Sequence, residues 1–433
     1  MILNRTRNPQ PTELGTSDID LSATTPKRHT LKNGIPVDVY FSDSLEITRL
    51  DVVFEAGKAF AETSLIAITA MALITEGTKR HSAREIADFL NFRGINIEKS
   101  IDALTVGLTI YLQNKYLVEF LPLLHEMLTE SIFPETEFDV FLKNKKLEFD
   151  QLQRKTNYVA SRTCLEEMFG KSHVYGKYIQ SSDFETITLE QVQEFYRKRY
   201  GLQNCKFFLA GNIAGKDIAA LDSIFGSHPL RAEKNNIEIS VKANQNIAKA
   251  INMPESVQTS IRVGKIINLN WDSVELAKLL VVNNLLGGGF LGSRLMQNLR
   301  EEKGYCYGIY SVISIERNAI YMMISTDVGN DVAGPAVTEI FNEIRRLQTE
   351  PVGEEELTTT RRFLTGDFIR SIDGVFELAE RGRTQYAAHA DDTFARNYLD
   401  AIESITPEEI MHLAKKHFAE DSFVQVLAGK IEG

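Results

Sequence analysis

The sequence predicts an α+β protein made of two homologous half-chain domains, each a mostly antiparallel sheet covered by helices. Three observations lead to this prediction. The 433 residues are 43% hydrophobic and 25% charged, which is ordinary globular composition. Strand-like and helix-like segments are mixed within each half. Segments of the first half also recur in the second half, about half a chain later.

The repeat is clearest near the end of each half. Segment 187–200 reads ITLEQVQEFYRKRY, and segment 405–418, which lies 218 residues later, reads ITPEEIMHLAKKHF. Thr188 and Thr406 are suitable N-cap residues for the two helices that these segments predict. Each helix is followed by a short apolar run that contains Leu-Ala-Gly and reads as a strand.

A second pair of similar segments begins at Pro134 and Pro351, at nearly the same offset. One similar pair could arise by chance, but two pairs at one offset indicate a duplicated fold. The polar stretch that follows the first repeat lacks hydrophobic periodicity and reads as a linker. We therefore predict domains over 1–228 and 247–433, with a linker over 229–246.

The elements of the first half follow from hydrophobic period and turn residues. Alternating runs predict strands over 30–41 and 47–57, with Asn33-Gly34 forming a turn within the first run. A further strand at 103–112 is expected to be a sheet edge that could accept a peptide strand. The predicted helices span 64–76, 82–93, 117–131 and 135–155.

Charge and cysteine content exclude several classes of protein. The net charge of −11 argues against non-specific binding to nucleic acid or to anionic membranes. Cys164, Cys205 and Cys306 are far apart, so neither a disulfide framework nor a thiolate zinc site is expected. The polar N-terminal residues resemble no secretory signal, and no apolar run is long enough to span a membrane. We expect a cytoplasmic protein, or a periplasmic one if a signal was removed.

The histidines show no spacing that is typical of a metal site. His412 and His417 are five residues apart, so a helix would splay them, and His125-Glu126 does not begin an H-E-x-x-H motif. We expect each histidine to lie at the surface or to be satisfied in the core. The eight are His29, His81, His125, His173, His228, His389, His412 and His417.

Several segments together resemble the pitrilysin/insulin-degrading-enzyme family, the inverzincins, and in particular its small bacterial members, which are similar to mitochondrial processing peptidase subunits. The resemblance covers roughly residues 27–431. It implies two homologous domains that face each other as a clamshell with a peptide between them. The segments that carry it are LKNGIPV (31–37), EGTKRHSAREIADFLNFRG (76–94), FPETEFDVFLKNKKLEF (133–149) and GGGFLGSRLMQNLREEKGYCYGIYS (287–311).

The resemblance also shows what the chain lacks. Family members bind catalytic zinc through H-x-x-E-H on a helix and a further glutamate downstream. Counting back from Gly77 places Ile68 and Ala72 at the histidine positions and Met71 at the glutamate position. Only Glu148 remains of the ligand set. We therefore expect no metal and no cofactor on this chain.

A second family feature is kept. The resemblance assigns Arg300 and Tyr307, seven residues apart, to an arginine–tyrosine pair that supports the substrate at the scissile bond. Arginine can hold a peptide carbonyl, and a tyrosine hydroxyl can donate to a developing oxyanion. The alternative is structural: Arg300 would pair with Glu301 or Glu302, and Tyr307 would lie half-buried in the next strand.

A lost zinc motif and a kept arginine–tyrosine pair are typical of the zinc-less subunit of a heterodimeric endopeptidase. Its partner would be a homologous chain with an intact H-x-x-E-H motif, zinc would lie on that partner, and the substrate would be a peptide. A homodimer is possible without the partner. Two alternatives stay open: a structural or assembly protein with a peptidase-like fold, and a self-contained hydrolase with another metal site.

Overall fold

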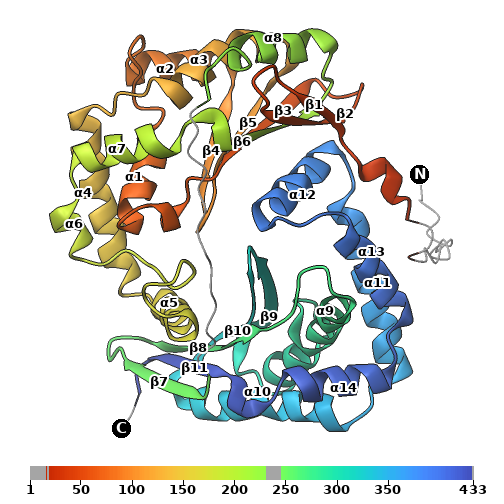
Figure 1. Cartoon of the computed structure of the whole chain (residues 1–433). Helices are drawn as coiled ribbons and strands as arrows, with labels where there is room; N and C mark the ends of the chain where they lie inside the picture. Colours follow the sequence, from red (N-terminus) through yellow and green to blue (C-terminus); the bar gives the residue numbers. More distant parts are fainter. Residues whose placement is uncertain (1–15, 17–18, 231–244, 432–433) are drawn as a thin grey trace, which may run out of the picture.

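The computed structural model describes residues 16, 19–230 and 245–431, which form two β-sheets with helices around them (Figure 1). The first sheet lies in residues 27–211 and the second in residues 247–429, and the two face each other across the middle of the molecule. The first sheet has the order β1 (Lys27–Thr30), β2 (Pro36–Phe41), β6 (Cys205–Gly211), β3 (Ile47–Phe54), β5 (Val106–Gln113) and β4 (Asn96–Ile101). The second has the order β7 (Ile247–Asn252), β11 (Val424–Gly429), β8 (Gln258–Ile267), β10 (Ala319–Gly329) and β9 (Cys306–Glu316).

The duplicated fold is confirmed by this strand order. The run β2-β6-β3-β5-β4 of the first sheet corresponds strand for strand to β7-β11-β8-β10-β9 of the second. In each sheet one pair is parallel, β2 with β6 and β7 with β11, and the other pairs of the run are antiparallel. Thr188 and Thr406 cap the equivalent helices α7 (Leu189–Arg199) and α14 (Pro407–His417), each through a full capping box.

Most helices cover the outer face of the sheet in their own half. Apolar residues of the first-half helices and of β3 and β5 form one core, and those of the second-half helices and of β8 and β10 form another. The first half contributes α1 (Ser64–Leu73), α2 (Ala83–Arg93), α3 (Leu117–Thr129), α4 (Glu135–Leu152), α6 (Asp183–Thr186), α7 and α8 (Gly215–Phe225). The second contributes α9 (Val274–Gly287), α10 (Ala333–Thr349), α11 (Glu354–Ser371), α13 (Thr393–Ser404) and α14.

One helix from each half crosses to the other sheet. α5 (Thr156–Phe169) packs on β8 and β11, and α12 (Val375–Ala388) packs on β2 and β6 (Figure 1). Glycines allow this close approach. A Cβ at Gly264 would lie 2.8 Å from the Met168 sulfur, and one at Gly382 would lie 2.1 Å from the Tyr40 hydroxyl. The exchange gives each half an apolar contact that it cannot make alone.

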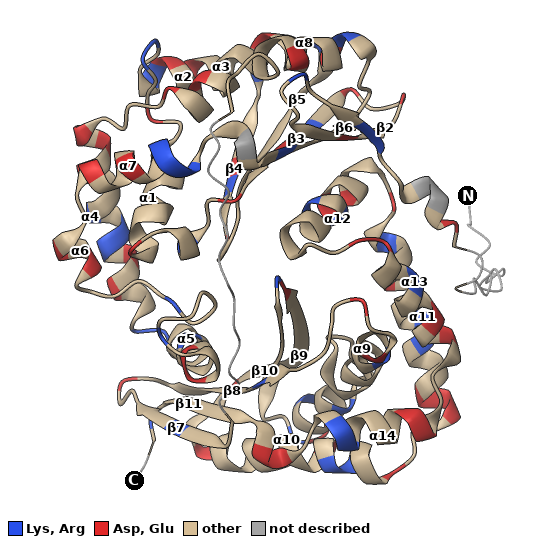
Figure 2. Ribbon diagram, in the orientation of Figure 1, with Lys and Arg blue, Asp and Glu red and all other residues tan. Residues whose placement is uncertain are grey.

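The tip of the β9–β10 hairpin also joins the halves. Arg317 forms an ion pair with Glu55 at 2.8 Å, and the Tyr175 hydroxyl donates to the Arg317 carbonyl at 2.7 Å. Arg317 Nε donates to the Ala387 carbonyl at 3.3 Å. Figure 2 shows charged residues of both signs at the end of β9 that is nearest α12. The hairpin tip is therefore a polar contact added to the exchanged helices.

The strand predicted at 103–112 is not a sheet edge, because β5 pairs with β3 on one side and with β4 on the other. The edge on that side of the sheet is β4, where Glu98 is exposed and the Lys99 side chain is 26% exposed, and charged residues of this kind protect a strand edge. Most of the predicted linker, residues 231–244, lies outside the described residues, so the domain boundaries stay a prediction. No helix in the described ranges has the length and apolar character that crossing a membrane requires.

Candidate functional site

Arg300 and Tyr307 lie next to each other at the start of β9. Arg300 belongs to the π-helical segment η6 (Met296–Glu302), and Tyr307 is the second residue of β9. The chain turns between them at Gly304, which has a φ of +63°. This turn folds the arginine back, so that its guanidinium carbon lies 5.6 Å from the centre of the Tyr307 ring. The two residues that the sequence singled out are thus adjacent in space.

A β-bulge directs Tyr307 outward. Thr326 of β10 pairs with Ile309, but Val328 pairs with Cys306, so two residues of β9 lie opposite Asp327 alone. Bulges of this kind change the direction in which a side chain points, and they occur often at sheet edges and next to active sites. Tyr307 is 90% exposed as a result. The expectation of a half-buried structural tyrosine is therefore wrong.

The pair lies in an open environment, and among the described residues Arg300 has an ion-pair partner in Glu301. Arg300 makes an ion pair with Glu301 at 3.5 Å, as the structural alternative expected. That contact is long and the Arg300 side chain is about one third exposed, so it contributes little to stability. Along β9, Tyr310 and Val312 are also largely exposed. An arginine and an exposed tyrosine are thus presented together at β9, an edge strand of the second sheet.

The positions that the resemblance assigns to a zinc motif are filled by apolar side chains on α1. Met71 is buried, and the Tyr200 hydroxyl donates to its sulfur at 3.6 Å. Ile68 is partly buried against a cluster that includes Phe149 of α4. Ala72 offers only a methyl group. None of these side chains can bind zinc.

The glutamate that the resemblance assigns to the ligand set pairs with a lysine. Glu148, on α4, pairs with Lys145 at 3.0 Å, and more than half of its side chain is exposed. Within the described ranges, no three histidine, cysteine, aspartate or glutamate residues gather in a way that could hold a metal ion. Zinc therefore does not fit this chain at the family position.

Sequence reasoning missed Lys99. This residue reaches from the edge strand β4 to the C-terminal end of α1, where its ammonium donates to the Ala72 carbonyl and, at 2.8 Å, to the Thr75 hydroxyl. Burial lowers the pKa of Lys99, and the charge of Glu76, 3.9 Å away, partly opposes this shift. A fixed cation beside Ala72 repels a metal dication. The only sequence signal was a lysine within an otherwise ordinary strand.

The fold brings together two histidines that spacing did not pair. His125 Nε2 lies 3.2 Å from His228 Nδ1, where α3 meets the end of α8. Burial, and then the neighbouring His228, lower the pKa of His125. His417, which we expected to be splayed from His412, contacts Glu275 at 2.5 Å. Each of these three histidines thus has a side-chain contact within the protein, and the structural role that the spacing indicated stays a prediction.

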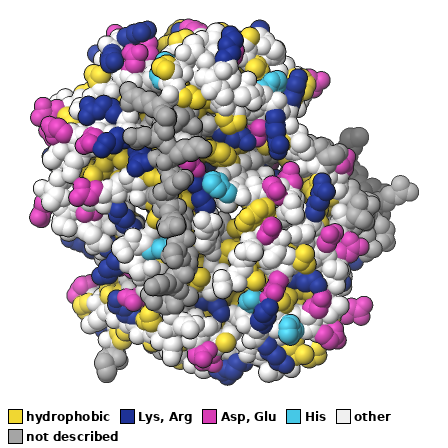
Figure 3. Space-filling model, viewed as in Figure 1, with side chains coloured by type: hydrophobic (Ala, Val, Ile, Leu, Met, Phe, Trp, Pro, Cys, Tyr) yellow, Lys and Arg dark blue, Asp and Glu magenta, His cyan; other side chains and the backbone are white. Residues whose placement is uncertain are grey.

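On the face drawn in Figure 3, the described charged side chains do not gather into a large patch of one charge sign. Acidic and basic side chains are interspersed over it, with apolar side chains between them (Figure 3).

Comparison with known proteins finds similarity to peptidases and to inactive peptidase homologues. Residues 186–364 match a family model described as the peptidase M16 inactive domain. The chain is 22% identical to the uncharacterized zinc protease YmxG of Bacillus subtilis, over 91% of this chain and 96% of that protein. It is 24% identical to the probable inactive metalloprotease YmfF of the same organism, over 70% of this chain and 73% of that protein.

Solved structures show the same fold. A peptidase M16 inactive domain from Pseudomonas fluorescens aligns with a TM-score of 0.84 at 19% identity, and the alignment covers 94% of this chain and 98% of that one. The periplasmic protease PqqL of Escherichia coli aligns with a TM-score of 0.74 at 14% identity, and the alignment covers 94% of this chain but 46% of PqqL. The present chain therefore corresponds to less than half of that longer protease.

Proposed function

We propose that this chain, a zinc-less member of the M16-like peptidase homologues, is the supporting subunit of a two-chain zinc endopeptidase. The observation that carries the proposal is the Arg300–Tyr307 pair. The two side chains lie together, and Tyr307 is 90% exposed at the edge strand β9. An exposed tyrosine beside an arginine leaves the phenol hydroxyl and the guanidinium free to meet a ligand or a partner.

The size of the chain supports a two-chain complex. The chain aligns with 46% of PqqL, so a protease of that length has room for two units of this size. The positions of the zinc motif in this unit are apolar, at Ile68, Met71 and Ala72. The second unit would be a homologous chain with an intact H-x-x-E-H motif, and zinc would lie there.

The chemistry available to this chain is binding and charge stabilisation. When a peptide is bound at the partner's metal, the metal supplies the Lewis acid. Arg300 would hold a substrate carbonyl through its forked donors. The Tyr307 hydroxyl would donate to the carbonyl oxygen of the scissile bond as negative charge develops there. Neither role requires a proton to leave this chain.

A second candidate is a structural or assembly role without proteolysis. It is favoured by the description of the matched family model as an inactive domain and by the similarity to a probable inactive metalloprotease. In that case Arg300 and Tyr307 would bind a partner or nothing. The chain could then also act as a homodimer.

The test is Tyr307→Phe in the reconstituted complex. The chain is mixed with the H-x-x-E-H homologue of its own organism, and turnover of a fluorogenic peptide library is measured. Loss of one oxyanion donor typically lowers kcat about 100-fold or more, so a fall of that size is expected. Assembly, followed by size-exclusion chromatography, should be unchanged. Tyr310→Phe, on the same strand, is the matched control and should keep full activity. Unchanged turnover in Tyr307→Phe would transfer support to the structural role.

A further inference from the structure

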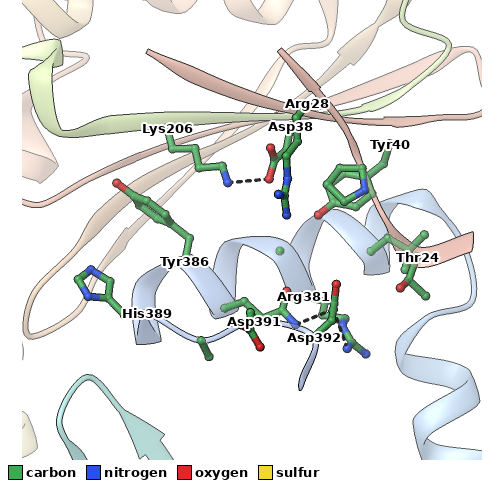
Figure 4. A pocket seen from close by; sticks show the side chains of 15 residues that line it. Thr24, Arg28, Asp38, Tyr40, Lys206, Arg381, Tyr386, His389, Asp391 and Asp392 are labelled. Atoms are coloured by element: carbon green, nitrogen blue, oxygen red, sulfur yellow. Dashed lines mark hydrogen bonds and ion pairs between the residues drawn. The ribbon is translucent and has the colours of Figure 1, made fainter. Parts of the chain in front are cut away.

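A second site lies between the halves, away from Arg300 and Tyr307. A cavity of about 330 Å³ separates strands β1, β2 and β6 from helix α12 and the loop that follows it (Figure 4). Neither member of the Arg300–Tyr307 pair lines it. Its volume is at the lower end of the range for small-molecule sites.

The hydroxyl of a buried tyrosine opens into this cavity and has no partner among the described residues. Tyr40 of β2 is 6% exposed, and its hydroxyl is directed toward the centre of the cavity (Figure 4). Among the described residues, no hydrogen bond satisfies this hydroxyl. Gly382 of α12 leaves the room that the hydroxyl occupies, since a Cβ there would lie 2.1 Å away from it. The hydroxyl oxygen is open to the cavity, so a ligand that displaces water there can accept its hydrogen bond.

A cation without a carboxylate partner lies beside it. Arg28 of β1 extends its guanidinium into the cavity near the Tyr40 hydroxyl (Figure 4), and within the described ranges it has no hydrogen bond or ion pair. The other cations are engaged. Lys206 pairs with Asp38 at 2.6 Å, and Arg381 pairs with Asp392 at 3.2 Å. A guanidinium and a phenol hydroxyl together are good donors for a carboxylate.

The opposite wall offers an acid. Asp391, in the loop between α12 and α13, is exposed and accepts a hydrogen bond from the Thr393 amide at 2.7 Å. It has no ion-pair partner in the described part of the chain. A ligand ammonium group would provide that partner.

The balance of charge limits the ligand. Three cations and three acids line the cavity, so a net-neutral ligand is favoured over a dianion such as phosphate. The six are Arg28, Lys206, Arg381, Asp38, Asp391 and Asp392.

We infer that this cavity binds a zwitterion of amino-acid or dipeptide size, with its carboxylate on Arg28 and Tyr40 and its ammonium on Asp391. Arg28 and Tyr40 belong to the first half and Asp391 to the second. A bound ligand would therefore link the two halves. The inference does not depend on the proposed peptidase role.

The experiment uses the full chain and calorimetric titration. The probes are the twenty free amino acids and the dipeptide Ala-Ala, followed by analogues of any binder that lack one charge: the N-acetyl form and the amide. At least one zwitterion should bind, and each analogue should bind about tenfold more weakly or worse. Inorganic phosphate, titrated in parallel, should bind more weakly than the zwitterion.

Three variants test the assigned contacts. Tyr40→Phe and Arg28→Ala should each weaken binding of the zwitterion about tenfold. Asp391→Asn should weaken binding of the zwitterion but leave the lower affinity for the N-acetyl form unchanged. Arg84→Ala removes an exposed arginine elsewhere and should have no effect. The inference is overturned if no probe binds, if phosphate binds more tightly, or if binding is the same in the Tyr40 and Arg28 variants.

Discussion

The ion pair between Arg317 and Glu55 allows a quantitative test of how the halves are joined. Its two side chains are 11% and 17% exposed, and their charged atoms are 2.8 Å apart. Removing one partner costs about 3–5 kcal/mol for a buried pair, against about 0–1 kcal/mol for the whole contribution of an exposed pair. In an Arg317 variant, Glu55 would still have His389 3.5 Å away, which reduces the loss of stability. We therefore expect Arg317→Met to lower the free energy of unfolding by about 2 kcal/mol.

The assay is urea unfolding of four proteins: the parent chain, Arg317→Met, Glu55→Gln and the double variant. If the contact is direct, the double variant should be about 1–2 kcal/mol more stable than the sum of the single losses predicts. Arg345→Met is the matched control, because Arg345 pairs with Glu420 at 3.4 Å while both side chains are more than half exposed. It should cost less than about 1 kcal/mol. A coupling near zero, or equal losses in Arg317→Met and Arg345→Met, would refute the role of the hairpin tip.

The contacts of His125, Gly382 and Lys99 each allow a further test. Burial and His228 lower the pKa of His125, so the stability that its neutral form contributes is complete above a pH of about 6.5 and is lost as the pH falls. His125→Gln should reduce the loss of unfolding free energy between pH 7 and pH 5, measured by urea unfolding. An unchanged loss between these two pH values would contradict the prediction. Gly382→Ala should destabilise the chain by about 1–3 kcal/mol through its clash with the Tyr40 hydroxyl, and adding Tyr40→Phe should restore part of the loss. A variant with the zinc motif restored should bind zinc, as measured by calorimetry. Adding Lys99→Ala should tighten its zinc affinity about tenfold or more. Equal zinc affinities with and without Lys99→Ala would remove the role assigned to Lys99. The restoring changes are Ile68→His, Met71→Glu and Ala72→His.

Local signals in the sequence predicted the repeat well. Thr188 and Thr406 cap equivalent helices, as their position before amphipathic segments indicated.

The order of the strands was not predicted. β5 lies inside the sheet and has five consecutive buried residues. Hydrophobic periodicity alone does not show whether such a strand lies inside a sheet or at its edge.

The exchange of α5 and α12 between the sheets could not be read from the sequence. Amphipathic periodicity shows that a helix has an apolar face but not which sheet that face covers. The small residues at the crossings, such as Gly264 and Gly382, gain meaning only once their neighbours are known.

The candidate site was predicted in part. The spacing of Arg300 and Tyr307, together with the family resemblance, identified the pair, and the structure places the two side chains in contact. The exposure of Tyr307 depends on a β-bulge that no local pattern signals. Lys99 was missed because its contact with α1 links residues that are 27 positions apart.

The most direct test of the account is zinc content and peptidase activity, measured on the chain alone and after mixing with its H-x-x-E-H homologue. The account predicts that the isolated chain is metal-free and inactive and that the mixture is active with zinc on the partner. Zinc at unit stoichiometry and activity in the isolated chain would contradict it, because Ile68, Met71 and Ala72 supply no ligand for zinc.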